Sequence, residues 1–294
     1  MKNKTVSIAV LMACHNRKAL TLRILAQLEE AAARHGDLQT TTFLVDDASS
    51  DGTADEVSRQ FPNVALVAGS GSLFWSRGMV LAFKTARTVR QDWDYYLLLN
   101  DDLDLDVNAF ATVIRDCHAH NATNATIMVG LVRGPDGEVT YGGFARQSRR
   151  RPMQVSRVSV RQSEVAPADT FNANFVVLPA SLMEALGGLD PAFHHAYGDI
   201  DIGFRAKALN ARILVHGKSV GITPNHPEPP RPASALSRFL QRAGTMPRKP
   251  DGFRQYAVFM WRHGCWWMFP LYAAKYAFKS SCRLIYRKLK ARMT

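Results

Sequence analysis

Two adjacent carboxylates, Asp101 and Asp102, follow directly on an apolar run in the segment YYLLLNDDLDLD, residues 95–106. A short apolar run that ends abruptly in acids is typical of a buried strand in an α/β sheet, and ligands bind beyond the carboxyl ends of such strands. Asp and Asn oxygens are hard ligands that suit Mg²⁺ or Mn²⁺. The sequence therefore predicts a divalent-metal site here. The alternative is an acidic, solvated turn followed by a helix cap. Asp104 and Asp106 are expected to be caps or solvated residues.

Two further acid pairs, Asp46/Asp47 and Asp199/Asp201, lie where the pattern predicts the end of a strand or the opening of a helix. Loops at one edge of a parallel sheet converge in space, so all three pairs are expected to share one cleft. Carboxylates gathered at one rim repel each other. This arrangement therefore needs a cation or a specific hydrogen-bond donor.

Strands and helices must alternate along the chain to bring these acids together, and the hydrophobic periodicity predicts that they do. The predicted strands cover residues 6–13, 41–45, 63–67, 95–99, 127–133, 140–144, 171–178 and 212–216; the predicted helices cover 19–34, a short stretch ending at 59, 79–90, 107–120, 180–186 and 199–209. Such alternation predicts an α/β fold with a mostly parallel, Rossmann-like sheet flanked by helices.

The charge of the chain is high and unevenly distributed. The 294 residues carry a net charge of +12, and Asp251 is the only acid from Arg231 to the end. This asymmetry predicts contact with a polyanion or an anionic membrane surface, the alternative being a solvated basic tail. Four widely spaced cysteines without a CxxC pair, and the lack of a run of about 18 apolar residues, favour a cytoplasmic protein without a clear membrane span.

Four motifs in order resemble glycosyltransferase family 2, most closely its bacterial rhamnosyltransferase- and galactofuranosyltransferase-like members. They are VDDASSDGT (45–53), GSLFWSRGM (71–79), LLLNDD (97–102) and GGLD with YGDIDIGFR (187–205). The resemblance implies the GT-A fold, a nucleotide-diphosphate-sugar donor, a divalent metal and inversion at the sugar carbon. It implies a catalytic domain over residues 1–230, with a nucleotide-sugar-binding half (1–106) and an acceptor-binding half (107–230). Residues 231–294 form a basic, aromatic, helical extension.

The resemblance also assigns the donor and metal residues. Asp102 would bind Mn²⁺ or Mg²⁺, and His226 matches a histidine that is a further metal ligand in several members. The residues expected to hold the donor are Ala13, Asn16, Arg17, Asp46, Asp47, Asn100 and Asp101. Among them, Asp46 would face a pyrimidine N3–H of the base, and Asp101 would contact the ribose or a metal-bound water.

On the acceptor side, Asp199 matches the acidic position of the family's ED or GD motif and is the candidate general base. His194 and His195 precede it and are expected to line the acceptor side or the rim. Asp201 has two interpretations, an acceptor contact and an ion pair with Arg205 at i, i+4 that orders the helix start.

Two positions near the donor depart from the family pattern. The family often has Asn where this chain has Ser72, and Gly where it has Arg77. Arg77 is expected to reach a diphosphate or a charged sugar, or to point to solvent. Trp75 is expected either to stack on a sugar or base or to belong to the core.

The C-terminal region interleaves aromatic residues with Lys and Arg, a pattern that fits a helix lying in a membrane interface. A peripheral contact with the inner face of the plasma membrane would suit a lipid-linked oligosaccharide acceptor. The competing interpretations are an oligomer contact and a helix packed on the catalytic domain. Single-stranded nucleic acid also binds basic and aromatic residues, but no recognised nucleic-acid module accompanies the pattern, so no nucleic-acid partner is expected.

The sequence thus predicts a metal-dependent inverting glycosyltransferase in surface polysaccharide synthesis, with a dTDP- or UDP-linked donor and rhamnose as one candidate sugar. One rival is a sugar-nucleotide pyrophosphorylase, which would need a Gly-rich basic signature that ACHNRKAL (13–20) does not supply. The other is a non-catalytic membrane- or polyanion-binding protein.

Overall fold

The computed structural model describes residues 5–122, 125–162, 164–194, 197–224, 252–274 and 276–278. The chain divides into two compact units. The first comprises Met1–Arg146 and Val155–Asn225; the second comprises Gln147–Gln154 and His226–Thr294. The division at Asn225 falls near the boundary predicted at residue 230, but it also moves a short Arg-rich segment into the second unit.

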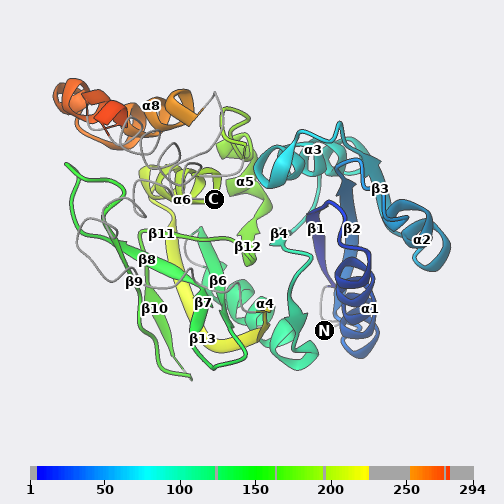
Figure 1. Ribbon diagram of the computed structural model, residues 1–294. Coiled ribbons are helices and arrows are strands. Elements are labelled where there is room, and N and C mark those ends of the chain that lie inside the picture. Colours follow the sequence, from blue (N-terminus) through cyan, green and yellow to red (C-terminus); the bar gives the residue numbers. More distant parts are fainter. Residues whose placement is uncertain are drawn as a thin grey trace. The chain divides into compact units, whose positions relative to one another are not determined.

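The first unit is built on a ten-stranded sheet, whose first half is parallel (Figure 1). Strands β3, β2, β1 and β4 lie in that order and pair in parallel. The elements of this half are β1 (Val6–Cys14), α1 (Lys18–Arg34), β2 (Leu38–Asp46), α2 (Thr53–Gln60), β3 (Ala65–Ala68), α3 (Phe74–Val89) and β4 (Tyr95–Leu99).

The second half of the sheet is mixed. Strand β12 runs antiparallel between β4 and β6, β13 is parallel to β6, and β10 is antiparallel to β13. Its elements are β5 (Asp104–Leu105), α4 (Val107–Asn121), β6 (Thr126–Arg133), β7 (Val139–Tyr141), β10 (Val165–Pro167), β12 (Phe175–Pro179), α5 (Ala180–Leu186), α6 (Gly198–Ala208) and β13 (Arg212–Ile222). A separate sheet joins β8 (Gly143–Arg146), β9 (Val155–Arg157) and β11 (Thr170–Phe171).

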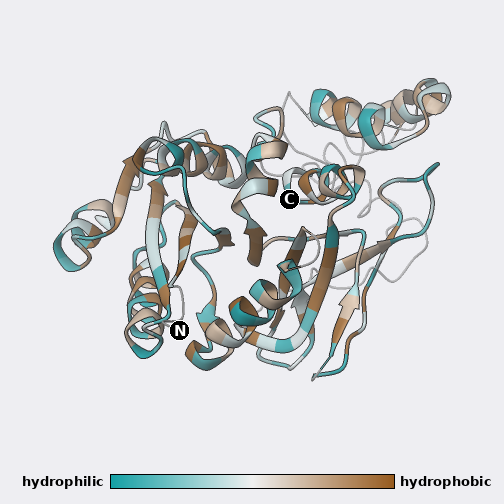
Figure 2. Cartoon of the chain, turned by 180° about the vertical axis from the view of Figure 1, so that it is seen from behind, coloured by the Kyte–Doolittle hydropathy of each residue, from teal (hydrophilic) through white to brown (hydrophobic). Residues whose placement is uncertain are grey.

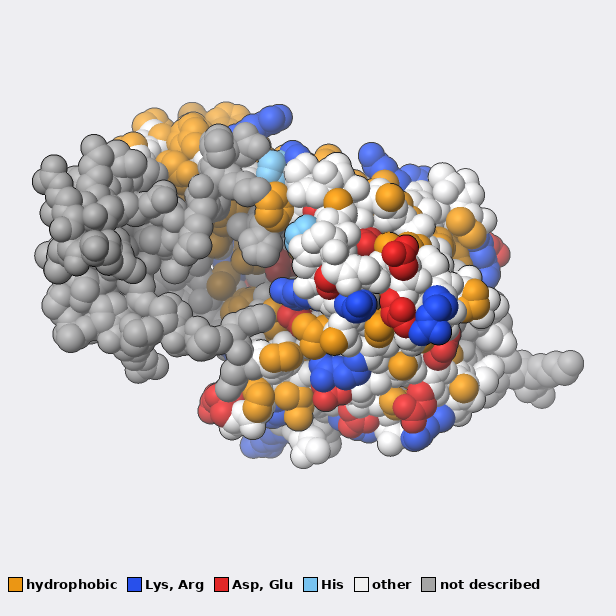
Figure 3. Space-filling view, turned by 45° about the vertical axis from the view of Figure 1, so that its right-hand side comes forward, with side chains coloured by type: hydrophobic (Ala, Val, Ile, Leu, Met, Phe, Trp, Pro, Cys, Tyr) orange, Lys and Arg blue, Asp and Glu red, His pale blue; other side chains and the backbone are white. Residues whose placement is uncertain are grey.

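Helices cover both faces of the large sheet, so its strands are buried on both sides. Alternate residues of β1 enter different cores: Leu11 packs with residues of α3, α5 and α6, whereas Val10 packs with residues of α1, α2 and α4. This follows from the two-residue period of a strand. Figure 2 shows the hydrophobic residues along these strands, and Figure 3 shows acidic and basic side chains interspersed on one outer face. The predicted α/β class is confirmed.

Two predicted elements differ from the structure for local reasons. Helix α3 begins at Phe74 instead of 79, because the Asp47 carboxylate accepts the N–H groups of Leu73 and Phe74 and fixes the start of the helix. The predicted strand 171–178 is interrupted by the segment 172–174, whose asparagines bond to neighbouring loops.

The described residues of the C-terminal region are mostly helical, as predicted. Helix α8 (Gly252–His263) is followed by a short 3₁₀ helix, η1 (Trp266–Met268). The Tyr272 hydroxyl donates to the carbonyl of Arg150 at 2.7 Å, which ties the two parts of the second unit together. Within the described residues, no helix is long and apolar enough to cross a membrane.

Candidate active site

The polar residues predicted to do chemistry gather at one edge of the large sheet, beyond β1, β2 and β4. Cys14 of β1 is in register with Asp46 of β2, and Leu99 of β4 is in register with Phe175 of β12. Because β12 is antiparallel to β4, its start lies beside the end of β4. The edge therefore gathers residues from the nucleotide half and from segment 172–174.

The loops after β1 and β2 are bonded to each other. The Asn16 N–H donates to Ser49 Oγ at 2.9 Å, and the Ser50 N–H donates to Asn16 Oδ1 at 2.7 Å. Asp46 is buried and one of its oxygens accepts from both the amide and the hydroxyl of Ser49. Ala13, the other predicted donor residue on β1, is partly buried and packs against the core. The structure thus brings Asn16 and Asp46 together.

Asp47 has a structural role that the sequence did not predict. Its carboxylate accepts three backbone N–H groups, from Gly71 at 2.7 Å, Leu73 at 2.9 Å and Phe74 at 3.0 Å. A Cβ on Gly69 would lie 2.8 Å from the same carboxylate, so the loop fits closely around it. The side chain thus shapes the loop that precedes α3, and its predicted contact with the donor stays a prediction.

Arg17 joins the two acids of the predicted metal site. Its Nη1 lies 2.8 Å from Asp101 Oδ1 and 3.4 Å from Asp102 Oδ2. The side chains of Asp101 and Asp102 are each 5% exposed, whereas the Arg17 side chain is 44% exposed. Burial raises the pKa of Asp101 to about 6, against the opposing effect of the Arg17 charge. A buried pair of acids with one mobile cation beside it is an environment that can exchange that cation for another.

The donor set fits a hard divalent cation. Asn174, which sequence reasoning missed, donates from Nδ2 to Asp102 Oδ1 at 3.2 Å. Asp101 Oδ2 and Asn174 Oδ1 are buried oxygens without a hydrogen-bond donor. Two carboxylates and an amide oxygen suit Mg²⁺ or Mn²⁺, which take further oxygens from water and substrate phosphates. No three His, Cys, Asp or Glu side chains cluster for a metal among the described residues, and His226 lies outside them.

Asp199 stands at the first turn of α6, where a helix N-terminus favours negative charge. Its Oδ2 accepts the Ala173 N–H at 3.1 Å, and the residue is half-buried. Tyr141, at the end of β7, lies within the electrostatic influence of both Asp199 and Asp102. Burial first, and then the charges of Asp102 and Asp199, raise the pKa of Tyr141 to about 12, so the hydroxyl stays protonated between them.

Asp201 supports one of its two predicted interpretations, the ion pair with Arg205. It is fully buried, and Arg205 Nε donates to it at 2.7 Å while also fixing the carbonyls of Leu186 and Gly188. The predicted ion pair is confirmed, and the buried carboxylate cannot line an acceptor surface. His194 is 9% exposed, and its ring stacks on Phe74 with centroids 6.5 Å apart. An acceptor role for His194 stays a prediction, and His195 lies outside the described residues.

The polar groups of three predicted donor residues contact protein atoms. Trp75 Nε1 donates to Asn100 Oδ1 at 2.7 Å, and Arg77 Nε donates to the carbonyl of Pro191 at 3.0 Å. Arg77 therefore ties α3 to the loop before α6. The residues that sequence reasoning missed are Tyr141, Ala173 and Asn174. The signal available for Asn174 was the pair of asparagines, Asn172 and Asn174, that interrupts the apolar residues of FNANFVVL (171–178).

No protein-family model matches this sequence, and no curated protein matches it. Solved structures do match. TarS 1–349 of S. aureus aligns at 12% identity and a TM-score of 0.53, covering 87% of this chain and 73% of that one. Mannosyltransferase PcManGT of Pyrobaculum calidifontis, in complex with GDP-Man and Mn²⁺, aligns at 16% and 0.53, covering 98% and 75%. GalNAc-T7 with UDP, GalNAc and Mn²⁺ aligns at 13% and 0.59, covering 90% and 50%. At these identities the likeness shows the fold, and the chain has the GT-A fold.

Proposed function

We propose that this protein is a metal-dependent inverting glycosyltransferase that uses a nucleotide-diphosphate sugar. The observation that carries the proposal is that adjacent residues of segment 172–174 bind both acids at one edge of the large sheet: the Ala173 N–H donates to Asp199 Oδ2, and Asn174 Nδ2 donates to Asp102 Oδ1. The complexes of the structural neighbours with UDP, or with GDP-Man and Mn²⁺, support the same class of donor and metal.

The chemistry follows from the groups at this edge. The Asp199 carboxylate would take the proton of an acceptor hydroxyl as that oxygen attacks the sugar carbon. The bond from the carbon to the diphosphate oxygen breaks in the same displacement, so the sugar inverts and the nucleoside diphosphate leaves with the electron pair. Mn²⁺ or Mg²⁺, held by Asp102 with Asp101 and Asn174, would supply Lewis-acid neutralisation of the leaving diphosphate.

Residues of the nucleotide half would bind and orient the donor. Asp46 and the bonded loops of Asn16 and Ser49 lie where the base is expected. Arg17 is half exposed and can leave the acids to pair with a phosphate, since a guanidinium suits phosphate geometry. Asp47 and Arg77 also hold the surrounding loops, and Asp201 is buried in its ion pair with Arg205.

The finer assignment is a dTDP- or UDP-linked sugar, with rhamnose as a candidate, transferred to a lipid-linked saccharide in surface polysaccharide synthesis at the cytoplasmic face of the membrane. It draws support from the aromatic surface of the second unit. Trp261, Trp266 and Trp267 are 63%, 71% and 56% exposed. Aromatic side chains with arginines beside them favour a membrane interface.

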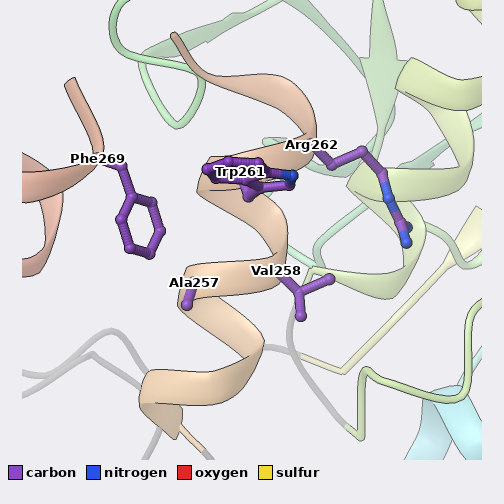
Figure 4. Close-up of a pocket in the computed structure, with 5 residues that line it drawn as sticks. All are labelled: Ala257, Val258, Trp261, Arg262 and Phe269. Atoms are coloured by element: carbon purple, nitrogen blue, oxygen red, sulfur yellow. The ribbon is translucent and has the colours of Figure 1, made fainter. Parts of the chain in front are cut away.

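The second unit that carries these tryptophans is also rich in arginine. The described residues of the second unit contain no Asp or Glu and five arginines, namely Arg149, Arg150, Arg151, Arg254 and Arg262. Arg150 lies over the Trp267 ring at 5.8 Å. Figure 4 shows a surface pocket of the same unit in which Arg262 accompanies the apolar side chains of Trp261 and Phe269. Anionic lipid is the partner that such a surface fits.

A thermal-shift screen tests the proposed function. Nucleotide sugars with UDP, dTDP or GDP are added with and without Mn²⁺, and a specific donor should raise the melting temperature only with the metal. Asp102→Asn should abolish the metal-dependent part of the shift. A metal-independent shift that is equal in wild type and Asp102→Asn would exclude Asp102 as the ligand.

A further inference from the structure

A hydrogen-bonded chain runs from the start of α3 to Asp199. Trp75 Nε1 donates to Asn100 Oδ1 at 2.7 Å, and Asn100 Nδ2 donates to the carbonyl of Ala173 at 3.3 Å. The Ala173 N–H in turn donates to Asp199 Oδ2 at 3.1 Å. The links pass from α3 through the end of β4 and segment 172–174 to α6, so the side chain of the candidate base is connected to the first turn of α3.

Asn100 holds the next residue of the same segment as well. Its backbone N–H donates to the carbonyl of Asn174 at 2.9 Å, and Asn174 Nδ2 donates to Asp102 Oδ1 at 3.2 Å. One asparagine therefore fixes both ends of a short bridge. One end carries the amide that holds Asp199, and the other carries the amide that holds Asp102.

The other side of the bridge is fixed independently. Asn172 Oδ1 accepts the Gly142 N–H at 2.9 Å, and its Nδ2 donates to the carbonyl of Thr140 at 3.2 Å. Segment 172–174 is thus held between β4 and the end of β7, next to Tyr141. It belongs to neither β11 nor β12, and its position depends on these side-chain bonds together with the backbone bonds of Asn172 to Gly142 and of Asn100 to Asn174.

We infer that Asn100, oriented by Trp75, is a positioning residue that sets the placement of Asp199 relative to Asp102 through segment 172–174. The inference rests on the proposed function. It gives Trp75 and Asn100, which the sequence predicts near the donor, a different role, because the Trp75 indole N–H donates to the Asn100 amide oxygen. Asn100 uses its amide oxygen and nitrogen, a combination that an aspartate or leucine of similar size cannot provide.

The rate should depend on this chain more than donor affinity does. Misplacement of a catalytic group by about 1 Å reduces rate by about 100-fold. Trp75→Phe keeps the ring and removes only the indole N–H. We expect Trp75→Phe to lower kcat about tenfold and Asn100→Ala about 100-fold, with KM for the donor changed less than about threefold in both.

Trp93→Phe is the matched control. Trp93 also donates its indole N–H, at 3.3 Å to the carbonyl of Ala86, but it belongs to the core and touches none of the site residues named above. Its loss should leave kcat unchanged. The double variant Trp75→Phe/Asn100→Ala should be no slower than Asn100→Ala alone, because both changes break one connection.

The structural link is tested without turnover by the indole N–H resonances in a ¹H–¹⁵N spectrum. The resonance lost in Trp75→Phe should move in Asn100→Ala, while the Trp93 resonance stays in place. An unmoved Trp75 resonance would overturn the inference even if the enzyme is active.

Three kinetic results would also overturn the inference. The first is an unchanged kcat in Trp75→Phe, and the second is a multiplicative loss of kcat in the double variant. The third is an effect confined to the KM for the donor, which would make Trp75 a donor contact. A wild-type protein without transfer activity would instead refute the proposed function.

Discussion

The Arg17 guanidinium lies 2.8 Å from Asp101 Oδ1, in the position of a counter-ion to the acids that we assign to the metal. An arginine and a divalent cation would compete for the same carboxylates. The arginine is the more mobile partner, because its side chain is 44% exposed and that of Asp101 only 5%. A donor diphosphate offers Arg17 a new partner when metal and nucleotide bind together.

Replacing Arg17 should therefore change metal binding in opposite directions with and without nucleotide. Arg17→Gln should tighten Mn²⁺ binding to the free protein by about tenfold, since it removes the competing charge. It should weaken binding of the nucleoside diphosphate in the presence of Mn²⁺. Calorimetric titrations measure both. The control is Arg23→Gln, which removes an exposed arginine of α1 that lies 3.8 Å from Asp104. Weaker Mn²⁺ binding to Arg17→Gln alone would refute the competition.

Asp101 should make the stability of the metal-free protein depend on pH. Burial raises its pKa from 3.8 to about 6, so the folded state binds this proton more tightly than the unfolded chain does. The resulting stabilisation is complete below about pH 4 and is lost as the pH rises through 6. Asp101→Asn should then be more stable than wild type at pH 8, by an amount on the order of 3 kcal/mol.

Denaturant unfolding at pH 8 and pH 5 measures this difference, which should shrink at the lower pH. Asp104→Asn, at an exposed acid, should show no such dependence. Mn²⁺ affinity of the wild type should fall as the pH drops through 6, because a protonated Asp101 is a poor ligand. A wild type that is as stable as Asp101→Asn at pH 8 would contradict the account of this carboxylate.

Two acids only two residues apart should respond to substitution in different ways. Asp201→Asn leaves the partly buried Arg205 without its charge partner and should lower the free energy of unfolding by about 3–5 kcal/mol. Asp199→Asn should leave stability nearly unchanged and reduce kcat by about 10²–10⁴-fold. Unfolding curves and turnover of the purified variants separate these effects. Equal stability losses would mean that Asp199 is also a structural residue.

Much of the site could be predicted because its residues follow directly on strands. The apolar run before Asp101 matches β4 residue for residue, and the cap role of Asp106 is confirmed by its bonds to the N–H groups of Asn108 and Ala109. Local patterns of this kind determine which residues reach the sheet edge. They also explain why the order of strands and helices could be read from periodicity.

The rest could not be predicted, because it depends on contacts between distant segments. Nothing local distinguishes Asp46 from Asp47, yet only the second accepts three loop amides from residues 71–74. Asn174 acquires its place only when β12 inserts antiparallel beside β4, a pairing that alternation of strands and helices does not predict. The bond from Trp75 to Asn100 could not be predicted either, because it joins residues that are 25 positions apart in the sequence.

The aromatic surface of the second unit should bind anionic lipid. Trp266→Ser/Trp267→Ser should reduce co-sedimentation with vesicles that contain phosphatidylglycerol, and wild type should bind phosphatidylcholine vesicles weakly. Val89→Ser/Leu209→Ser is the matched control, since these exposed apolar residues lie in the first unit. Undiminished sedimentation of the tryptophan variant would remove lipid as the partner. Concentration-dependent self-association that the same variant abolishes would assign the surface to a second copy.

The most direct measurement of the central claim is release of nucleoside diphosphate, coupled to sugar transfer, as a function of Mn²⁺. A panel of UDP-, dTDP- and GDP-sugars is incubated with saccharide acceptors and wild-type protein, Asp199→Asn or Asp102→Asn. The account predicts a glycosylated product and stoichiometric diphosphate with wild type and Mn²⁺. It predicts donor binding without transfer in Asp199→Asn, and neither metal-dependent binding nor transfer in Asp102→Asn. Transfer by wild type that persists in Asp199→Asn, or that is independent of metal and Asp102, would contradict it.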